Sequence, residues 1–397
     1  MATKVKKRII PYSKQSVSGS DIQEVVKVLK SDWITQGSKI KEFEDALCNY
    51  TGARYAVCVS SGTAALHLAC LAAGISKGDE VITSSITFIA SANAILYCGG
   101  KPVFADIQKD TVNIDPEEIK KKIARRIKAI IPVHFAGLPC EMEEISRIAQ
   151  RNKLIVIEDA AHALGAEYKL KDRQRWIRIG SCFHSDMTIL SFHPVKSITT
   201  GEGGAVLTNS RQLYKRLLML RNHGINKEKV DFVNPKPMLH ETGSWYYEMQ
   251  DLGFNYRITD FQCALGISQL KKLDHFIRLR IRVADMYNQE LSDVDGFILP
   301  HKQADVKSAW HIYCLRVKDQ TKRKRIFSKL RDAGILVQVH YIPVHLQPYY
   351  RRIFGYKEGD YPFSEEYYKQ TISLPLYPSI TTKEIQYVIR TLKEALA

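Results

Sequence analysis

One stretch of the sequence decides the fold: Leu154-Ile155-Val156-Ile157-Glu158-Asp159-Ala160-Ala161-His162 (residues 154–162). Its apolar first half has the length and β-branched content of a strand that is buried on both faces. Carboxylates and an imidazole follow at the point where such a strand must end. The stretch therefore predicts a buried parallel strand whose carboxyl end carries chemically active side chains.

The same pattern extends outward from this strand, over about residues 56–210. Short apolar runs alternate with helical patterns, which indicates βαβ units and a mainly parallel sheet between helical layers. This alternation predicts one large α/β domain. Strands are expected at 55–59, 81–82, 101–104, 129–132, 154–157, 188–190 and 205–207, and helices at 63–73, 91–97, 116–123 and 142–152.

The character of the chain changes after residue 260. An amphipathic pattern over about 260–291 predicts one connecting helix. Beyond it, expected strands at 312–317 and 335–341, a helix at 324–333 and a last helix that starts at a T-x-x-E capping box from Thr381 indicate a smaller α+β domain. We expect two packed domains, the N-terminal arm with the large domain over 1–270 and the connecting helix with the small domain over 271–397.

The charge balance is basic, with 58 Lys and Arg against 42 Asp and Glu and a net charge of +16. The basic residues form scattered clusters beside helical patterns, which favours solvated faces over a nucleic-acid groove. A sugar nucleotide or another phosphorylated small molecule also suits a basic surface. A basic protein that binds a partner without turnover remains the alternative from a different class.

The spacing of the cysteines and histidines and the length of the apolar runs indicate the cellular compartment and whether a metal site is expected. The eight cysteines are never closer than ten positions, which is neither a zinc spacing nor a dense disulfide framework. None of the twelve histidines forms H-E-x-x-H, so we expect no metal site. The N-terminus has no apolar signal region and no run approaches a membrane span of about 18 residues. We therefore expect a soluble, cytoplasmic protein with reduced thiols.

Lys196 ends a second strand-to-loop run, Thr188-Ile189-Leu190-Ser191-Phe192-His193-Pro194-Val195-Lys196. A primary amine near the protein interior can have a lowered pKa and form an imine with a carbonyl. A surface lysine in a loop is the alternative. Asp159, if its side chain is enclosed, needs a cationic partner, which a ligand could supply. A purely structural role for this carboxylate, in an ion pair within the protein or as a helix cap, is an equally good explanation.

A candidate phosphate site lies at Ser60-Ser61-Gly62-Thr63-Ala64-Ala65-Leu66, which opens an alanine-rich helix. Free N–H groups at a helix start bind phosphate, although ordinary capping uses the same residue types. Gly201-Glu202-Gly203-Gly204 lacks the spacing of a nucleotide loop and is typical of a tight turn. An amine, an enclosed acid, a ring-stacking aromatic and a phosphate-binding helix start together describe a pyridoxal phosphate (PLP) site.

These motifs, together with Thr199-Thr200-Gly201-Glu202-Gly203-Gly204, strongly resemble those of the DegT/DnrJ/EryC1/StrS sugar aminotransferases, over about residues 10–396. Within that family the chain looks most like the PseC branch, the UDP-4-amino-4,6-dideoxy-N-acetyl-β-L-altrosamine transaminases. The narrower likeness is carried by residues 245–250, 253–257, 338–345 and 372–377. The resemblance implies the aspartate aminotransferase fold (fold type I) and a homodimer with active sites at the subunit interface.

The resemblance also assigns roles at the cofactor. It implies that Lys196 is the catalytic lysine that binds PLP covalently and moves the proton. Asp159 would pair with the pyridine nitrogen, His162 would lie at the cofactor's hydroxyl edge and Phe88 would stack on the ring. The phosphate would be held by Gly62, Thr63 and Ser191, with Asn255 reaching over from the other subunit.

Substrate residues follow from the same resemblance, and each has a packing or turn role as its alternative. The sugar nucleotide is expected near Tyr12, Asp32, Trp33, Ile34, Thr35, Ser61, Gln338, Val339, His340 and Tyr341, with Tyr256 and Arg257 near the subunit boundary. Related dehydratases have histidine where this chain has Lys196, which favours amine transfer. The basic segment 168–181 is often shorter in relatives, and we expect a flap or hairpin there.

The expected activity is transfer of an amino group from L-glutamate to the C4 keto group of UDP-2-acetamido-2,6-dideoxy-β-L-arabino-hex-4-ulose. The resemblance places that step in pseudaminic acid biosynthesis. Alternatives are a transaminase for another nucleotide-linked keto sugar and a non-catalytic basic regulator with a PLP-type fold.

Overall fold

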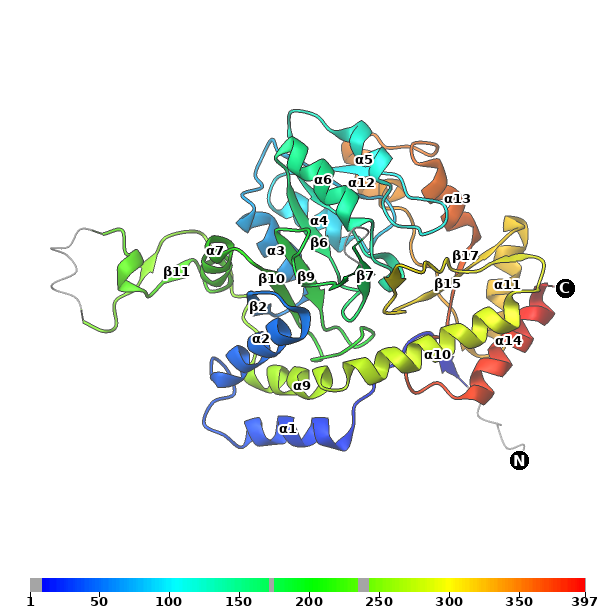
Figure 1. The fold of residues 1–397 in the computed structure, drawn as a ribbon, viewed down its shortest axis with the longest axis horizontal. Coiled ribbons are helices and arrows are strands. Elements are labelled where there is room, and N and C mark those ends of the chain that lie inside the picture. The colour runs from blue at the N-terminus through cyan, green and yellow to red at the C-terminus, as the bar shows by residue number, and fades with distance from the viewer. Residues whose placement is uncertain (1–8, 171–174, 235–242, 397) are drawn as a thin grey trace.

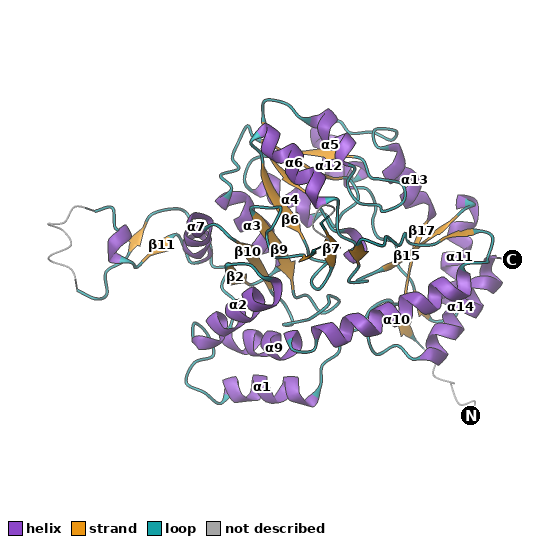
Figure 2. Ribbon diagram, in the orientation of Figure 1, coloured by secondary structure: helices purple, strands orange, loops and turns teal. Residues whose placement is uncertain are grey.

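The computed structural model describes residues 9–170, 175–234 and 243–396. A seven-stranded sheet lies among helices at its centre (Figure 2), in the order β2-β10-β9-β6-β5-β3-β4. Neighbouring strands are parallel except at β10, which runs antiparallel to both β2 and β9. The expected mainly parallel sheet is confirmed. The strands are β2 (Tyr55–Val59), β3 (Glu80–Ser84), β4 (Lys101–Ala105), β5 (Ile127–Ile131), β6 (Ile155–Asp159), β9 (Met187–Ser191) and β10 (Gly204–Thr208).

Both faces of this sheet are buried, because successive side chains point to opposite faces. Val57 and Val59 pack in one core cluster, whereas Cys58 between them packs in the other. The first cluster includes residues of α3 (Gly62–Ala72), α4 (Ala90–Tyr97) and α7 (Arg211–Arg221). The second includes residues of α2 (Ser38–Thr51), α5 (Pro116–Lys122), α6 (Met142–Asn152) and α9 (Asp260–Leu270).

The expected connecting helix over 260–291 is two helices, so the prediction of one continuous helix is wrong. α9 ends at Leu270 and α10 (Leu273–Leu291) begins after a short turn. Lys272 at this turn has its Nζ 2.5 Å from the buried carboxylate of Asp21. Figure 1 shows the two helices following each other through the lower part of the molecule toward the C-terminal part.

The C-terminal part has a core cluster of its own. It is built on the antiparallel strands β13 (Phe297–Ile298), β15 (Tyr313–Val317) and β17 (Thr371–Leu374), and on α11 (Gln320–Asp332) and α14 (Thr382–Leu396). Ile10 belongs to the same cluster, because β1 (Ile10–Pro11) pairs in parallel with β16 (Ile335–Leu336). A domain boundary near residue 270 remains our proposal.

The expected strand over 335–341 is wrong beyond Leu336. The pairing of β16 with β1 ends at Leu336, and Gln338 instead makes an isolated antiparallel bridge to Ser373 of β17. His340 Nδ1 hydrogen-bonds Ser373 Oγ at 2.7 Å, and the Tyr341 hydroxyl contacts His162. These side-chain contacts turn the segment toward the large sheet instead of extending β16.

The basic segment forms the expected hairpin in its described part. β7 (Glu167–Lys169) pairs antiparallel with β8 (Trp176–Arg178), and Lys171 and Arg173 lie outside the described residues. Arg178 is held by Glu167 and by the backbone oxygen of Tyr50.

The remaining elements lie around these layers, and the β11–β12 region projects from the body in Figure 1. In the part of the chain that is described, no helix is long and apolar enough to cross a membrane. All eight cysteines are free thiols. The elements are α1 (Gly19–Leu29), η1 (Phe135–Gly137), β11 (Ile225–Asn226), η2 (Lys229–Asp231), β12 (Glu248–Met249), β14 (Val306–Lys307), η3 (Val344–Leu346), α12 (Pro348–Phe354) and α13 (Pro362–Gln370).

Candidate active site

A cavity of about 380 Å³ lies at the carboxyl ends of β6 and β9, where open α/β sheets bind ligands. Asp159 ends β6, Ser191 ends β9, and the first turn of α3 faces them. The C-terminal part closes the cavity with His340 and Tyr341. Eleven predicted residues line it: Tyr12, Ser61, Gly62, Thr63, Phe88, Asp159, His162, Ser191, Lys196, His340 and Tyr341.

The other predicted residues do not line this cavity within one chain. Tyr256 donates to or accepts from His67 Nδ1 at 3.2 Å, and Arg257 donates to Asn222 at 2.5 Å. Trp33 borders an open groove between α1 and α2. The residues placed outside the cavity are Asp32, Trp33, Ile34, Thr35, Asn255, Tyr256, Arg257, Gln338 and Val339.

Lys196 is the only lysine that lines the cavity, counted over the described residues. Burial lowers the pKa of its amine to about 8, although the nearby Asp159 carboxylate acts in the opposite direction. The loop after β9 holds its backbone, since Lys196 N donates to His193 O at 2.9 Å. A larger fraction of this amine is neutral near pH 7 than of an exposed lysine.

Asp159 is 5 % exposed and has two hydrogen-bond donors, one for each carboxylate oxygen. Ser91 Oγ donates to Oδ2 at 2.6 Å, and Ala161 N donates to Oδ1 at 3.1 Å. Thr87 Oγ1 lies 2.8 Å from Ser91 Oγ. The sequence analysis missed Ser91 and Thr87, although both fall in or just after the hydroxyl-rich segment that follows β3.

His162 is a buried imidazole with one satisfied and one unsatisfied nitrogen. Its Nε2 lies 3.2 Å from the Tyr341 hydroxyl, whereas Nδ1 has no hydrogen-bond partner. Burial, with the charge of Lys196 adding to it, holds the pKa of His162 well below its usual range. The ring of His311 packs against it at 4.4 Å between centroids. Its buried surroundings therefore favour the neutral form of the ring.

The start of α3 forms a tight cradle beside β9. Ser61 caps the helix by accepting a hydrogen bond from Ala64 N at 3.1 Å. A Cβ atom placed on Gly62 would lie 2.8 Å from Ser191 Cβ, so no larger residue fits there without movement. Glycine keeps the backbone N–H groups of the helix start open toward the cavity.

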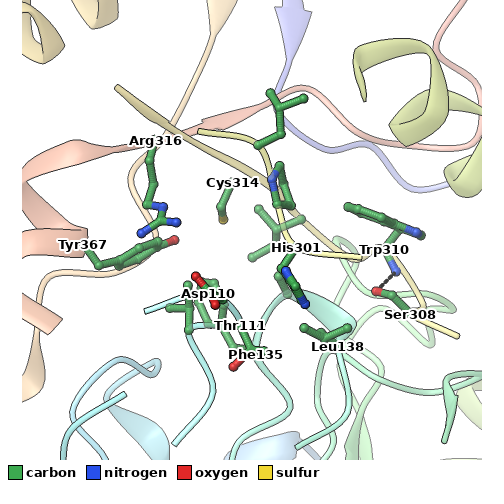
Figure 3. A pocket seen from close by; sticks show the side chains of 15 residues that line it. Asp110, Thr111, Phe135, Leu138, His301, Ser308, Trp310, Cys314, Arg316 and Tyr367 are labelled. Carbon is green, nitrogen blue, oxygen red and sulfur yellow. Dashed lines mark hydrogen bonds between the residues drawn. The ribbon is translucent and has the colours of Figure 1, made fainter. Parts of the chain in front are cut away.

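A second pocket has a volume of about 40 Å³, and Figure 3 draws the residues that line it. Phe135 lines it, and the Phe135 ring contacts the His162 ring edge-on with centroids 6.4 Å apart. In Figure 3, Arg316 and Tyr367 lie on one side of the pocket and His301 and Trp310 on the other. Its volume admits water but no cofactor, and none of the predicted site residues lines it.

The residues of the larger cavity fit PLP. Its volume lies within the range of small-molecule sites. His162 Nδ1 has no partner in the protein and can hydrogen-bond a polar group of the cofactor. The close approach of Gly62 to Ser191 leaves room for a phosphate at the helix start, and Lys196 is an amine with a lowered pKa. Among the described residues, Asp159 supplies the one buried carboxylate that lines the cavity.

Comparisons with known proteins agree with this fit. The model of the DegT/DnrJ/EryC1/StrS aminotransferase family matches residues 15–393. The UDP-4-amino-4,6-dideoxy-N-acetyl-β-L-altrosamine transaminase of Campylobacter jejuni subsp. jejuni is 39 % identical over 97 % of this chain and 96 % of its own.

Solved structures match over nearly the whole chain. The structure of Helicobacter pylori PseC, an aminotransferase involved in the biosynthesis of pseudoaminic acid, has a TM-score of 0.88 and 32 % identity, covering 98 % of this chain and 99 % of that one. The PLP-form of the sugar aminotransferase Spr1654 from Streptococcus pneumoniae has a TM-score of 0.88 and 31 % identity, with the same coverage. Fold type I and PLP are thereby confirmed.

Proposed function

The chain belongs to the DegT/DnrJ/EryC1/StrS aminotransferase family, and we propose that it transfers an amino group from L-glutamate to the C4 keto group of UDP-2-acetamido-2,6-dideoxy-β-L-arabino-hex-4-ulose. The protein is a PLP-dependent sugar aminotransferase, so a non-catalytic regulator is no longer an alternative. The exact sugar, the glutamate donor, the place in pseudaminic acid biosynthesis and the cytoplasmic location are parts of the proposal.

One observation carries the proposal. A single cavity brings together Lys196, Asp159 and His162 with the start of α3, in a chain that is 39 % identical to a transaminase named for this amino sugar. An amine with a lowered pKa, an enclosed carboxylate and a neutral imidazole are the groups that amine transfer needs.

The chain's own residues divide the work of binding and proton transfer. Bound PLP supplies an electron sink for the carbon that gains or loses the amine. Lys196 Nζ would bind the cofactor covalently at its carbonyl carbon. Once the substrate amine has displaced it there, the free Nζ would take and return the proton at the reacting carbon. Asp159 would hold the ring nitrogen, and His162 would present Nδ1 to the ring hydroxyl. Phe88 would stack on the ring, and Gly62, Thr63 and Ser191, which line the cavity, would hold the phosphate.

The sugar nucleotide binds beside the residues that the N-terminal arm and the C-terminal part contribute to the cavity. Tyr12, His340 and Tyr341 line the cavity together with Ser61, and the rings of Tyr12 and His340 lie 5.5 Å apart. The N-terminal arm and the C-terminal part hold these rings, since Leu376 N donates to Tyr12 O at 3.0 Å. Aromatic rings with polar edges suit a uracil or a hexose ring.

The residues outside the cavity are explained by a homodimer in which each copy completes the other's site. Large apolar side chains are exposed near them, with Trp33 at 66 %, Ile34 at 48 % and Leu252 at 73 %. Surfaces with such side chains are typical of interfaces between subunits. In this arrangement Asn255 reaches the partner's phosphate cradle, and Trp33, Tyr256 and Arg257 lie at the boundary.

The test is product identification with purified holoenzyme. The protein is incubated with ¹⁵N-labelled L-glutamate and, separately, the β-L-arabino 4-keto UDP-sugar, its C5 epimer and a 3-keto UDP-sugar. Mass spectrometry should find the label in a UDP-amino sugar only with the β-L-arabino substrate, with 2-oxoglutarate formed in equal amount. A Lys196→Ala variant is the negative control. Label in no product overturns the proposed reaction.

A second candidate is transamination of another nucleotide-linked keto sugar. The Streptococcus pneumoniae sugar aminotransferase matches this chain with the same TM-score as PseC, so overall similarity does not single out one sugar. Label in the product of the C5 epimer or of the 3-keto sugar would support this candidate.

A further inference from the structure

A chain of hydroxyl groups leads from the segment after β3 to the carboxylate of Asp159. Thr87 Oγ1 lies 2.8 Å from Ser91 Oγ, and Ser91 Oγ lies 2.6 Å from Asp159 Oδ2. All three side chains are buried, with exposed fractions of 2 %, 1 % and 5 %. Ser91 Oγ is also 3.4 Å from Phe88 O, which is a longer contact.

The carboxylate fixes the direction of these hydrogen bonds. An ionised carboxylate only accepts, so the single proton of Ser91 Oγ points to Asp159. Ser91 Oγ is then left as an acceptor, and Thr87 donates to it. Each donor polarises the next, which strengthens the bond to the carboxylate in a site of low dielectric.

We propose that Ser91, supported by Thr87, is a positioning residue whose hydrogen bond holds the Asp159 carboxylate toward the pyridine nitrogen of PLP. The inference rests on the role proposed for Asp159. Ser91 and Thr87 both line the cavity. In this role Ser91 acts through the carboxylate of Asp159, to which it donates.

Hydrogen bonds to the Asp159 carboxylate influence whether the proton between it and the pyridine nitrogen lies on the ring. The proton between a pyridine nitrogen and a carboxylate stays on the nitrogen when the carboxylate is stabilised as an anion. Ser91 supplies that stabilisation at Oδ2, and Ala161 N supplies it at Oδ1. Without the serine hydroxyl the carboxylate becomes the stronger base and draws the proton from the ring. The electron sink is then weaker, and the carboxylate is free to turn about one remaining donor.

The opposite side of the same strand provides a matched control. Ser185 Oγ donates to Glu158, the neighbour of Asp159 in β6, and does not contact Asp159. Ser185→Ala removes the same group from the adjacent carboxylate. A general loosening of β6 would affect both variants, whereas the proposed effect belongs to Ser91 alone.

The experiment measures ring-nitrogen protonation directly. Holoenzyme is prepared with PLP labelled with ¹⁵N in the ring, and the nitrogen's chemical shift is recorded by solid-state NMR for the wild type, Ser91→Ala, Ser91→Thr, Thr87→Val and Ser185→Ala. Equilibrium dialysis gives the PLP dissociation constant for each protein. No sugar substrate is needed, so the result is independent of which sugar is the substrate.

Ser91→Ala should move the nitrogen signal toward the unprotonated position and raise the dissociation constant about ten-fold. Ser91→Thr should restore the wild-type signal, Thr87→Val should give a smaller shift in the same direction, and Ser185→Ala should give none. A wild-type signal in Ser91→Ala overturns the inference. If Ser91→Ala does not fold, an unshifted signal in Thr87→Val overturns it instead. An Asp159→Asn holoenzyme with a wild-type signal would overturn the role of Asp159 itself.

Discussion

Glu158 and Asp159 are neighbours in β6, yet their carboxylates lie on opposite faces of the sheet and have different partners. Asp159 faces the cavity and accepts from Ser91. Glu158 faces away from it and lies 2.8 Å from His134 Nε2. Cys140 N donates to His134 Nδ1 at 3.0 Å, which leaves the imidazole proton on the nitrogen that faces Glu158. Asp159 thus belongs to the candidate active site, whereas Glu158 belongs to the hydrogen-bond network on the other face of the sheet.

Because the two carboxylates have different partners, we expect Glu158→Gln to reduce mainly the stability of the protein and Asp159→Asn to reduce mainly its activity. Burial raises the pKa of Glu158, but hydrogen bonds from His134, Ser185 and Thr188 outweigh it and leave the pKa lowered. Glu158→Gln should therefore lower the free energy of unfolding by about 2 kcal/mol, because a buried charge-assisted network is broken. Asp159→Asn should change it by less than about 1 kcal/mol while removing most of the activity. Urea unfolding of the apoprotein and a transaminase assay separate the two, and equal stability losses would contradict the division.

Lys196→Ala should abolish covalent attachment of PLP while leaving the phosphate, stacking and ring-nitrogen contacts. We expect PLP to remain bound noncovalently and turnover to fall by several orders of magnitude, because a covalent catalyst and a general base are lost together. Borohydride reduction followed by peptide mapping checks the attachment site. Labelling of another lysine, or an active Lys196→Ala variant, would refute the assignment.

The pKa of Lys196 predicts how cofactor capture depends on pH. Burial lowers the pKa from 10.5 to about 8, and only the neutral amine attacks a carbonyl. The rate at which apoprotein captures PLP covalently should therefore rise as the pH rises and level off above about pH 8. Asp159 acts to raise this pKa, so Asp159→Asn should shift the midpoint to lower pH. Stopped-flow absorbance measures both midpoints, and a midpoint near 10.5 would contradict the buried environment.

Gly62→Ala should weaken PLP binding by about ten-fold or more, because the new Cβ would lie 2.8 Å from Ser191 Cβ in the phosphate cradle. Gly19→Ala is its control. Gly19 is also the first residue of a helix, and nothing lies within 4 Å of the Cβ position. Equilibrium dialysis should find wild-type affinity for the control, and equal affinity in both variants would show that the cradle is looser than the structure indicates.

The proposed homodimer predicts complementation between two inactive variants. Lys196→Ala disables a chain's own lysine, and Asn255→Ala disables the partner's phosphate cradle. A mixture that has exchanged subunits should regain up to about a quarter of wild-type activity, because half of the dimers are mixed and each has one intact site. Each variant alone is the control. No recovery in mixtures whose exchange is shown by mass spectrometry would indicate that Asn255 acts within its own chain.

The sequence by itself determined the central layers and the position of the chemistry. Apolar runs such as residues 154–157 can be buried only inside a sheet that is covered on both faces, so their alternation with helices implied the architecture. Parallel strands place their carboxyl ends at one edge, and this is why Lys196 and Asp159 were predicted to share a site. Lys196 and Asp159 do line one cavity.

Only the tertiary structure decided what no local pattern encodes. The two-residue periodicity of a strand cannot show that Ser91 donates a hydrogen bond to Asp159, which lies 68 positions later in the chain. Nor does it show that β16 stops at Leu336 so that His340 and Tyr341 reach the cavity. Nor does a helical pattern show that α9 and α10 are separate helices, or that Lys272 in the turn between them contacts the distant Asp21. Such contacts join segments far apart in the chain, and their geometry is set by packing, whereas local patterning reports only which face of an element is apolar.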